Sequence, residues 1–209
     1  MGTYSKSNFG SISGKVGEGV GSKWRGIKYL RSLPEKSSKA ASTKQLEVQA
    51  KLALSAEMLS PIKNVLNLGF GDKNLSGKSG YNVAVKNFHA NCILGNYPNL
   101  TVDYARMLLS KGALEPLRAP TIGYNGKLQL SWISVLNKQS AFFDDEVLAV
   151  VYNQSKGLYL LDDTAMRNDS LVEIEIGASS GDIIHLWVFC VIRGGTEVSK
   201  SQYVGTITI

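Results

Sequence analysis

Residues 121–134, with the sequence TIGYNGKLQLSWIS, carry the clearest structural signal of the chain. Asn125-Gly126 suits a type I′ turn, because both central residues of that turn need a positive φ and its twist matches a β-hairpin. After the turn, apolar and polar side chains alternate, which is the period of a strand with one buried face. The stretch therefore predicts two paired strands, Thr121–Tyr124 and Lys127–Ser134.

The rest of the C-terminal region repeats this pattern of short alternating runs, separated by Gly, Asn, Asp and Ser. The further runs are Glu146–Asn153, Gly157–Leu161, Ser170–Ile176, Ile183–Arg193 and Ser201–Ile209. About seven strands in about ninety residues are typical of an immunoglobulin-like or fibronectin-III-like sandwich. We expect residues 117–209 to form this sandwich and to fold alone. Its best core candidates are Leu128, Leu130, Trp132, Leu148, Val150, Tyr152, Leu186, Val188, Cys190 and Ile192.

Residues 42–116 have a mainly helical pattern. Ser42 and Gln45 form a capping-box pattern before a run of helical period, and Pro61 interrupts that run. Leu100–Leu109 fits either a strand or a helix, and we favour a strand that leads into the sandwich. The expected helices are Leu46–Leu59, Ile62–Leu68 and Tyr81 to about Leu94, with a loop over Asp72–Gly80.

Residues 1–41 are rich in Gly and Ser and predict a basic β-ribbon arm. Side chains alternate on both sides of Arg25-Gly26, so we expect this dipeptide to be the turn of a hairpin over residues 18–32. Trp24 and Ile27 would then be cross-strand neighbours. A two-stranded ribbon with so little apolar surface is marginal alone, so it needs the rest of the protein or a neighbour. The predicted fold class is therefore α+β: an N-terminal β-ribbon and a short helical segment, followed by a C-terminal antiparallel sandwich.

Charge is unevenly distributed along the 209 residues, whose formal net charge is +6. Residues 1–50 hold nine Lys/Arg and three Asp/Glu, whereas residues 117–209 hold seven and ten. A basic N-terminal segment can bind nucleic acid or anionic lipid, or the acidic C-terminal half of another copy. A solvated basic face with no partner is the plainest interpretation.

The residues that enzymes, metals and phosphates require do not occur in recognisable patterns. Three residues separate Gly10 from Gly14-Lys15 where a phosphate-binding P-loop needs four, and Val16 follows where it needs Ser or Thr. The two histidines suggest no metal cluster, and the two cysteines, Cys92 and Cys190, fit small buried apolar side chains. We therefore expect no catalytic residue, no metal and no cofactor.

The chain has no segment suited to crossing a bilayer. Its longest apolar run, Ile183–Ile192, is interrupted by His185 and is far too short to span a membrane. The N-terminus lacks the apolar run of a secretory signal. We expect a protein that stays inside the cell or is released by a non-classical route.

Several short motifs together resemble a widespread set of uncharacterised proteins from Bacteroidota. The N-terminal motifs are SGKVG (13–17), WRG (24–26), Tyr29 and RSLP (31–34). The later motifs, in the same order, are LSP (59–61), LGF (68–70), YN (81–82), YP (97–98) and DY (103–104). The resemblance covers most of the chain and implies a bacterial source, a signature region joined to a β-sandwich, and no catalytic residue.

Two functions then fit the sequence best. The first is a structural protein that self-assembles head-to-tail into a filament, fibre or phage-like particle, in which the N-terminal ribbon adds to a neighbour's sheet. Its expected interface residues are Val20, Trp24, Arg25, Ile27, Tyr29 and Arg31. The alternative is nucleic-acid binding, with Lys23, Arg25, Lys28 and Arg31 neutralising phosphates beside stacking aromatics. An adhesive or carbohydrate-binding module is a third hypothesis, on fold analogy alone.

Overall fold

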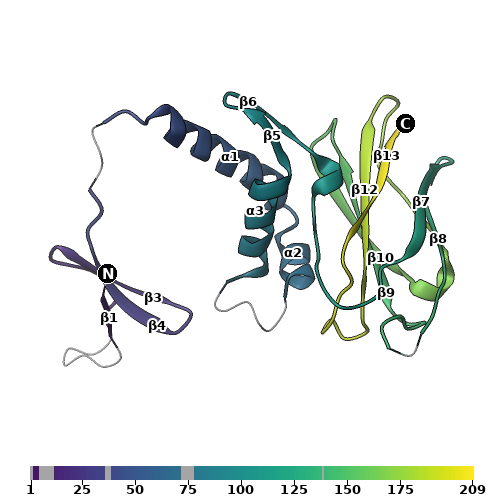
Figure 1. Ribbon diagram of the computed structural model, residues 1–209, viewed down its shortest axis with the longest axis horizontal. Helices are drawn as coiled ribbons and strands as arrows, with labels where there is room; N and C mark the ends of the chain where they lie inside the picture. The colour runs from purple at the N-terminus through teal and green to yellow at the C-terminus, as the bar shows by residue number, and fades with distance from the viewer. Residues whose placement is uncertain (1, 5–11, 36–38, 72–77, 138) are drawn as a thin grey trace. The chain divides into compact units, whose positions relative to one another are not determined.

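The computed structural model describes residues 2–4, 12–35, 39–71, 78–137 and 139–209 (Figure 1). Parts of the predicted arm, and most of the loop predicted over residues 72–80, lie outside these residues. The chain divides into two compact units, Met1–Ser42 and Thr43–Ile209. The antiparallel sheets and the helices confirm the α+β class with its sandwich.

The first unit is an antiparallel sheet of four strands in its described residues, with the order β1-β4-β3-β2. Its strands are β1 (Gly2–Tyr4), β2 (Gly14–Val16), β3 (Gly19–Trp24) and β4 (Ile27–Ser32). The predicted hairpin is confirmed, because Trp24 pairs with Ile27 across Arg25 and Gly26. Arg25 and Gly26 have φ values of 48° and 86°, the positive values that a type I′ turn needs. The ribbon predicted as two strands is thus widened by β1 and β2.

The helical segment consists of α1 (Thr43–Leu59), α2 (Lys63–Gly69) and α3 (Gly80–Asn91), followed by the hairpin β5 (Ile93–Asn96) and β6 (Asn99–Val102). The predicted end of the third helix at Leu94 is wrong, because Ile93 and Leu94 already belong to β5. Gly95 has a φ of 82° and lies so close to the Asn99 carbonyl that a Cβ would overlap it. Its glycine therefore serves the hairpin and not a helix end. The strand favoured for residues 100–109 is correct only as far as Val102, since a 3-10 turn (η1, Tyr104–Arg106) follows.

The C-terminal strands form the predicted sandwich, with its two sheets in the orders β11-β8-β7 and β10-β9-β12-β13. The strands are β7 (Arg118–Tyr124), β8 (Leu128–Ile133), β9 (Glu146–Asn153), β10 (Leu158–Met166), β11 (Leu171–Ile174), β12 (Ile183–Val191) and β13 (Gln202–Thr208). The fourth strand, β10, pairs with the third, β9, whereas the fourth strand of a constant-type immunoglobulin domain joins the other sheet. Of the two predicted sandwich types, the strand order therefore matches the fibronectin-III-like one.

Both faces of the four-stranded sheet are buried. Along β9, Val147, Ala149 and Val151 point into the sandwich, and Val150 and Tyr152 point to the opposite side. That opposite side packs against the helices, which lie beside this sheet in Figure 1. Val150 and Tyr152 are therefore core residues, as predicted, but of the core shared with the helices. The segments predicted as separate, 42–116 and 117–209, share this core within one unit.

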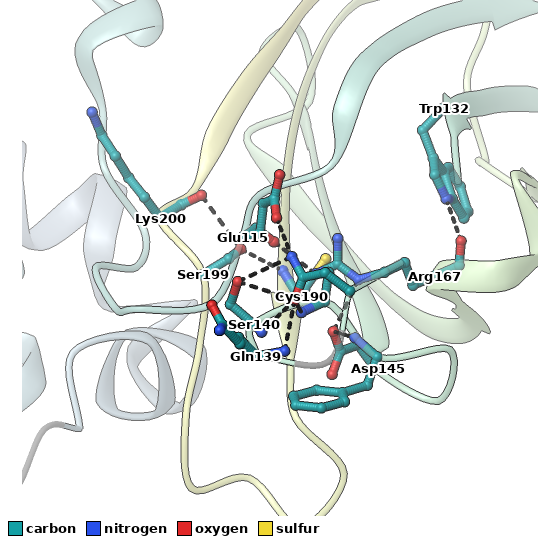
Figure 2. Close-up of polar contacts among 12 residues, drawn as sticks. Glu115, Trp132, Gln139, Ser140, Asp145, Arg167, Cys190, Ser199 and Lys200 are labelled. Carbon is teal, nitrogen blue, oxygen red and sulfur yellow. Dashed lines mark hydrogen bonds and ion pairs between the residues drawn. The ribbon is translucent and has the colours of Figure 1, made fainter. Parts of the chain in front are cut away.

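A buried ion pair between Arg167 and Asp145 connects several segments of the sandwich, as Figure 2 shows. The Arg167 Nε donates to Asp145 Oδ2 at 2.9 Å, and Arg167 Nη2 donates to the Glu115 carbonyl at 2.6 Å. The indole N–H of Trp132 donates to the Arg167 carbonyl at 2.8 Å. The Asp145 carboxylate is fully buried. These bonds join the segment before β7, strand β8 and the end of β10.

Candidate functional site

The described part of the N-terminal sheet has almost no buried residues. Among its described residues, Gly21 alone is buried. Trp24 and Ile27 leave 52% and 51% of their surfaces exposed, and Val16, Leu30 and Leu33 are exposed as well. Isolated strands with so little buried apolar surface are marginally stable in water. The sheet is therefore an apolar surface without a partner in the described part of its own unit.

The structure brings most of the predicted interface residues onto one face of this sheet. Val20 lies opposite Arg31, and Trp24 lies opposite Ile27, with Tyr29 between them along β4. Side chains two positions apart on a strand share a face, so these five form one continuous surface. Arg25, the sixth predicted residue, is in the turn, and its guanidinium carbon lies 5.4 Å from the centre of the Trp24 ring.

The four cations predicted to contact nucleic acid do not share a face. Lys23 and Lys28 are directly opposite each other on the face away from Trp24, whereas Arg31 is on the Trp24 face and Arg25 is in the turn. Like charges directly opposite on a sheet repel, and no ion pair among the described residues involves either lysine. An anion bound at this lysine pair would relieve that repulsion.

The positive charge of the protein is concentrated in this unit. Residues 1–42 hold eight Lys/Arg and two Asp/Glu, a net charge of +6. Residues 43–209 hold fifteen of each sign and are neutral overall. The unit with the exposed apolar face is thus also the unit that attracts an acidic partner.

The second unit contains an aromatic cluster around His185 that the sequence analysis missed. The imidazole stacks on Tyr104 with 4.1 Å between ring centres, and Tyr152, Trp187 and Tyr203 surround it. Its Nδ1 lies 2.9 Å from the Tyr203 hydroxyl and its Nε2 lies 2.9 Å from Gln154 Oε1. The amide oxygen accepts from Nε2–H, so Nδ1 accepts from the tyrosine hydroxyl. The sequence showed the alternation along β12 but could not show this cluster, because the side chains around His185 come from η1, from β9 and the residue after it, and from β13.

This geometry makes His185 a structural residue. Burial lowers the pKa of its imidazole, which favours the neutral form, and both ring nitrogens are engaged. Burial also raises the pKa of Tyr104 to about 12, so the stacked phenol stays protonated at neutral pH. The cluster holds η1 against β12 and β13 and offers no free base.

Both cysteines are buried and unpaired, which confirms their prediction as small core side chains. Burial raises the pKa of each thiol to about 11, so neither forms a thiolate at neutral pH. In the described part of the chain, no three His, Cys, Asp or Glu side chains are placed to hold a metal ion. None of the described helices is both long enough and apolar enough to cross a membrane.

Comparison with known proteins places the chain in a family without giving it an activity. The model of a family of unknown function, DUF6266, matches residues 11–205. Comparison with curated proteins and with solved structures gave no match. The matched region includes the whole N-terminal hairpin, the helical segment and all of the sandwich except the end of β13. The chain therefore belongs to the DUF6266 family.

Proposed function

We propose that this protein is a non-enzymatic structural protein that self-assembles head-to-tail, into a filament, fibre or phage-like particle, through its N-terminal sheet. One observation carries the proposal: residues 1–42 form a sheet whose apolar side chains, including Trp24 and Ile27, remain exposed. Such a sheet gains stability when a neighbouring copy covers it.

Even a small gain from burial matters for this sheet, because small isolated sheets are marginally stable in water. Fully burying one large apolar side chain contributes roughly 1.5–3 kcal/mol. On the Trp24 face, Trp24 and Ile27 are each about half exposed. Covering this face would therefore contribute on the order of 2 kcal/mol, before the cost of association. In the described part of the sheet, the two outer strands, β1 and β2, also present edges to which another strand can add.

Head-to-tail contact follows from the difference between the two units. The basic sheet is suited to an acidic or apolar surface, and the neutral second unit differs from it in charge and in fold. A contact between two unlike surfaces leaves one of each free on every dimer. It therefore continues into a ring if the rotation closes and into a filament if it does not.

Truncation of Trp24 tests the proposal. We expect wild type to sediment as large particles and Trp24→Ala to form none, because truncating a buried aromatic anchor at an interface often costs ~2 kcal/mol or more. Phe143→Ala is the matched control, since Phe143 is 64% exposed and belongs to the other unit. Equal particle size for wild type and Trp24→Ala would refute the role of this face.

Nucleic-acid binding remains a second candidate because Lys23 and Lys28 face each other without an acid partner among the described residues. If the two lysines neutralise phosphates, affinity should fall ~10-fold between 50 and 200 mM salt. Titration of a labelled oligonucleotide over that range measures the slope. Lys28→Gln should reduce both affinity and slope if the lysine pair is the contact.

A further inference from the structure

The sandwich is closed along one side and open along the other. On the closed side, β7 packs against β13, and Gly205 lies against Ile122. On the other side the outer strands are β10 and β11, which belong to different sheets. Among the described residues, strand β10 pairs with β9 alone, so its second edge presents backbone groups to which another strand can add.

An apolar cavity of about 180 Å³ lies at this open side. Leu158 and Leu160 of β10 border it, and Val151 and Ile184 form its inner wall. Leu158 and Leu160 pair with Asn153 and Val151, so they face the sandwich interior. Leu158 is nevertheless 62% exposed, because the opening leaves it uncovered. Ile176, Gly177 and Ala178 complete the opposite border.

One end of the cavity is held in place by a polar clamp. The Lys156 ammonium bonds to the Gly177 carbonyl at 2.7 Å and to Asp182 at 3.0 Å. The Asn153 amide donates to Asp182 at 2.8 Å, and the Ser179 amide donates to the same carboxylate at 2.9 Å. These bonds fix the segment after β11, so the opening is preformed.

The surroundings of the open side are acidic. Asp162 and Asp163 follow the exposed leucines on β10. Neither carboxylate forms an ion pair among the described residues. The open side therefore combines a free strand edge, an apolar cavity and negative charge.

We propose that this open side, between β10 and β11, is the acceptor for the N-terminal sheet of a second copy. The inference rests on the proposed self-assembly and adds the surface that would receive the N-terminal sheet. An outer strand of the basic sheet extends the β10 edge, the Trp24 face of the sheet covers the opening of the cavity, and the cations of the sheet face the acids of β10. Backbone pairing combined with a side-chain pocket is the general mode of strand addition.

Mixing two defective variants tests the acceptor. Leu158→Lys places a charge at the mouth of the cavity, and Ile133→Lys is its control, because Ile133 is 56% exposed on the three-stranded sheet. Ala178→Leu is a second acceptor variant that fills the cavity without adding charge. Circular dichroism and thermal melting confirm that each variant is folded.

Leu158→Lys and Ala178→Leu should each be monomeric by light scattering, and Ile133→Lys should assemble as wild type does. A mixture of Trp24→Ala with Leu158→Lys should form dimers and nothing larger, because it contains one working donor and one working acceptor. Assembly of Leu158→Lys to wild-type size, or a mixture that stays monomeric, would overturn the acceptor. If only Trp24→Ala fails to assemble, self-assembly stands and the acceptor lies elsewhere. A wild-type protein that is always monomeric would refute both proposals.

Discussion

Removal of the helical segment from the sandwich should unfold the sandwich. In the fragment 117–209, the outer face of the four-stranded sheet loses its cover. The side chains that become exposed, all at least nine-tenths buried in the whole protein, are Val150, Tyr152, Trp187, Phe189 and Val191. At ~2 kcal/mol for each, the loss is on the order of 10 kcal/mol. That equals the whole stability of a typical domain, about 5–15 kcal/mol.

Fragments 43–209 and 117–209 provide the comparison, measured by circular dichroism and urea denaturation. Fragment 43–209 should unfold in one cooperative transition, because it contains both hydrophobic clusters. Fragment 117–209 should lack a cooperative transition or aggregate. This expectation replaces the one drawn from the sequence, that residues 117–209 fold alone. A cooperative transition of 117–209 at the same urea midpoint as 43–209 would refute the reasoning.

Two further predictions concern the second unit. Asp145→Asn should destabilise the protein by about 3–5 kcal/mol, because it leaves the buried Arg167 guanidinium without its counter-charge. Urea denaturation measures this loss of stability. An unchanged urea midpoint would show that the ion pair contributes nothing to stability. Burial lowers the pKa of His185 in the folded state, so its contribution to stability is complete above pH 6.5 and is lost as pH falls toward the lowered pKa. The urea midpoint of wild type should therefore drop between pH 7.5 and pH 5 more than that of His185→Gln, and parallel curves would contradict this role.

Local patterns allowed much of the fold to be predicted from the sequence. The strands of the sandwich were found because short alternating runs end at Gly, Asn and Asp, and turn residues act locally. The pairing of Trp24 with Ile27 followed from Arg25-Gly26 for the same reason. The third helix was extended too far because Ile93 and Leu94 continue an apolar helical period, while the hairpin that recruits them depends on Gly95 and residues after it.

Features that depend on distant partners could not be predicted. Strands β9 and β12 are apolar on both faces, so alternation does not say which face meets the helices. The Arg167–Asp145 pair joins residues 22 positions apart, and no local spacing indicates it. For the candidate site, the face with Val20, Trp24 and Ile27 was predictable from period two. The cavity beside β10 was not, because it forms only once β10 pairs with β9 as the outer strand of that sheet.

Sedimentation velocity of the full chain and of fragment 43–209, from 50 mM to 1 M salt, tests self-assembly through residues 1–42 most directly. Salt at 1 M reduces the screening length to ~3 Å, which weakens charge attraction but leaves strand pairing and apolar burial. We predict that the full chain forms large particles without nucleic acid, that these persist at 1 M salt, and that fragment 43–209 is monomeric throughout. A full chain that is monomeric at every salt concentration, or a fragment 43–209 that assembles as the full chain does, would contradict the account.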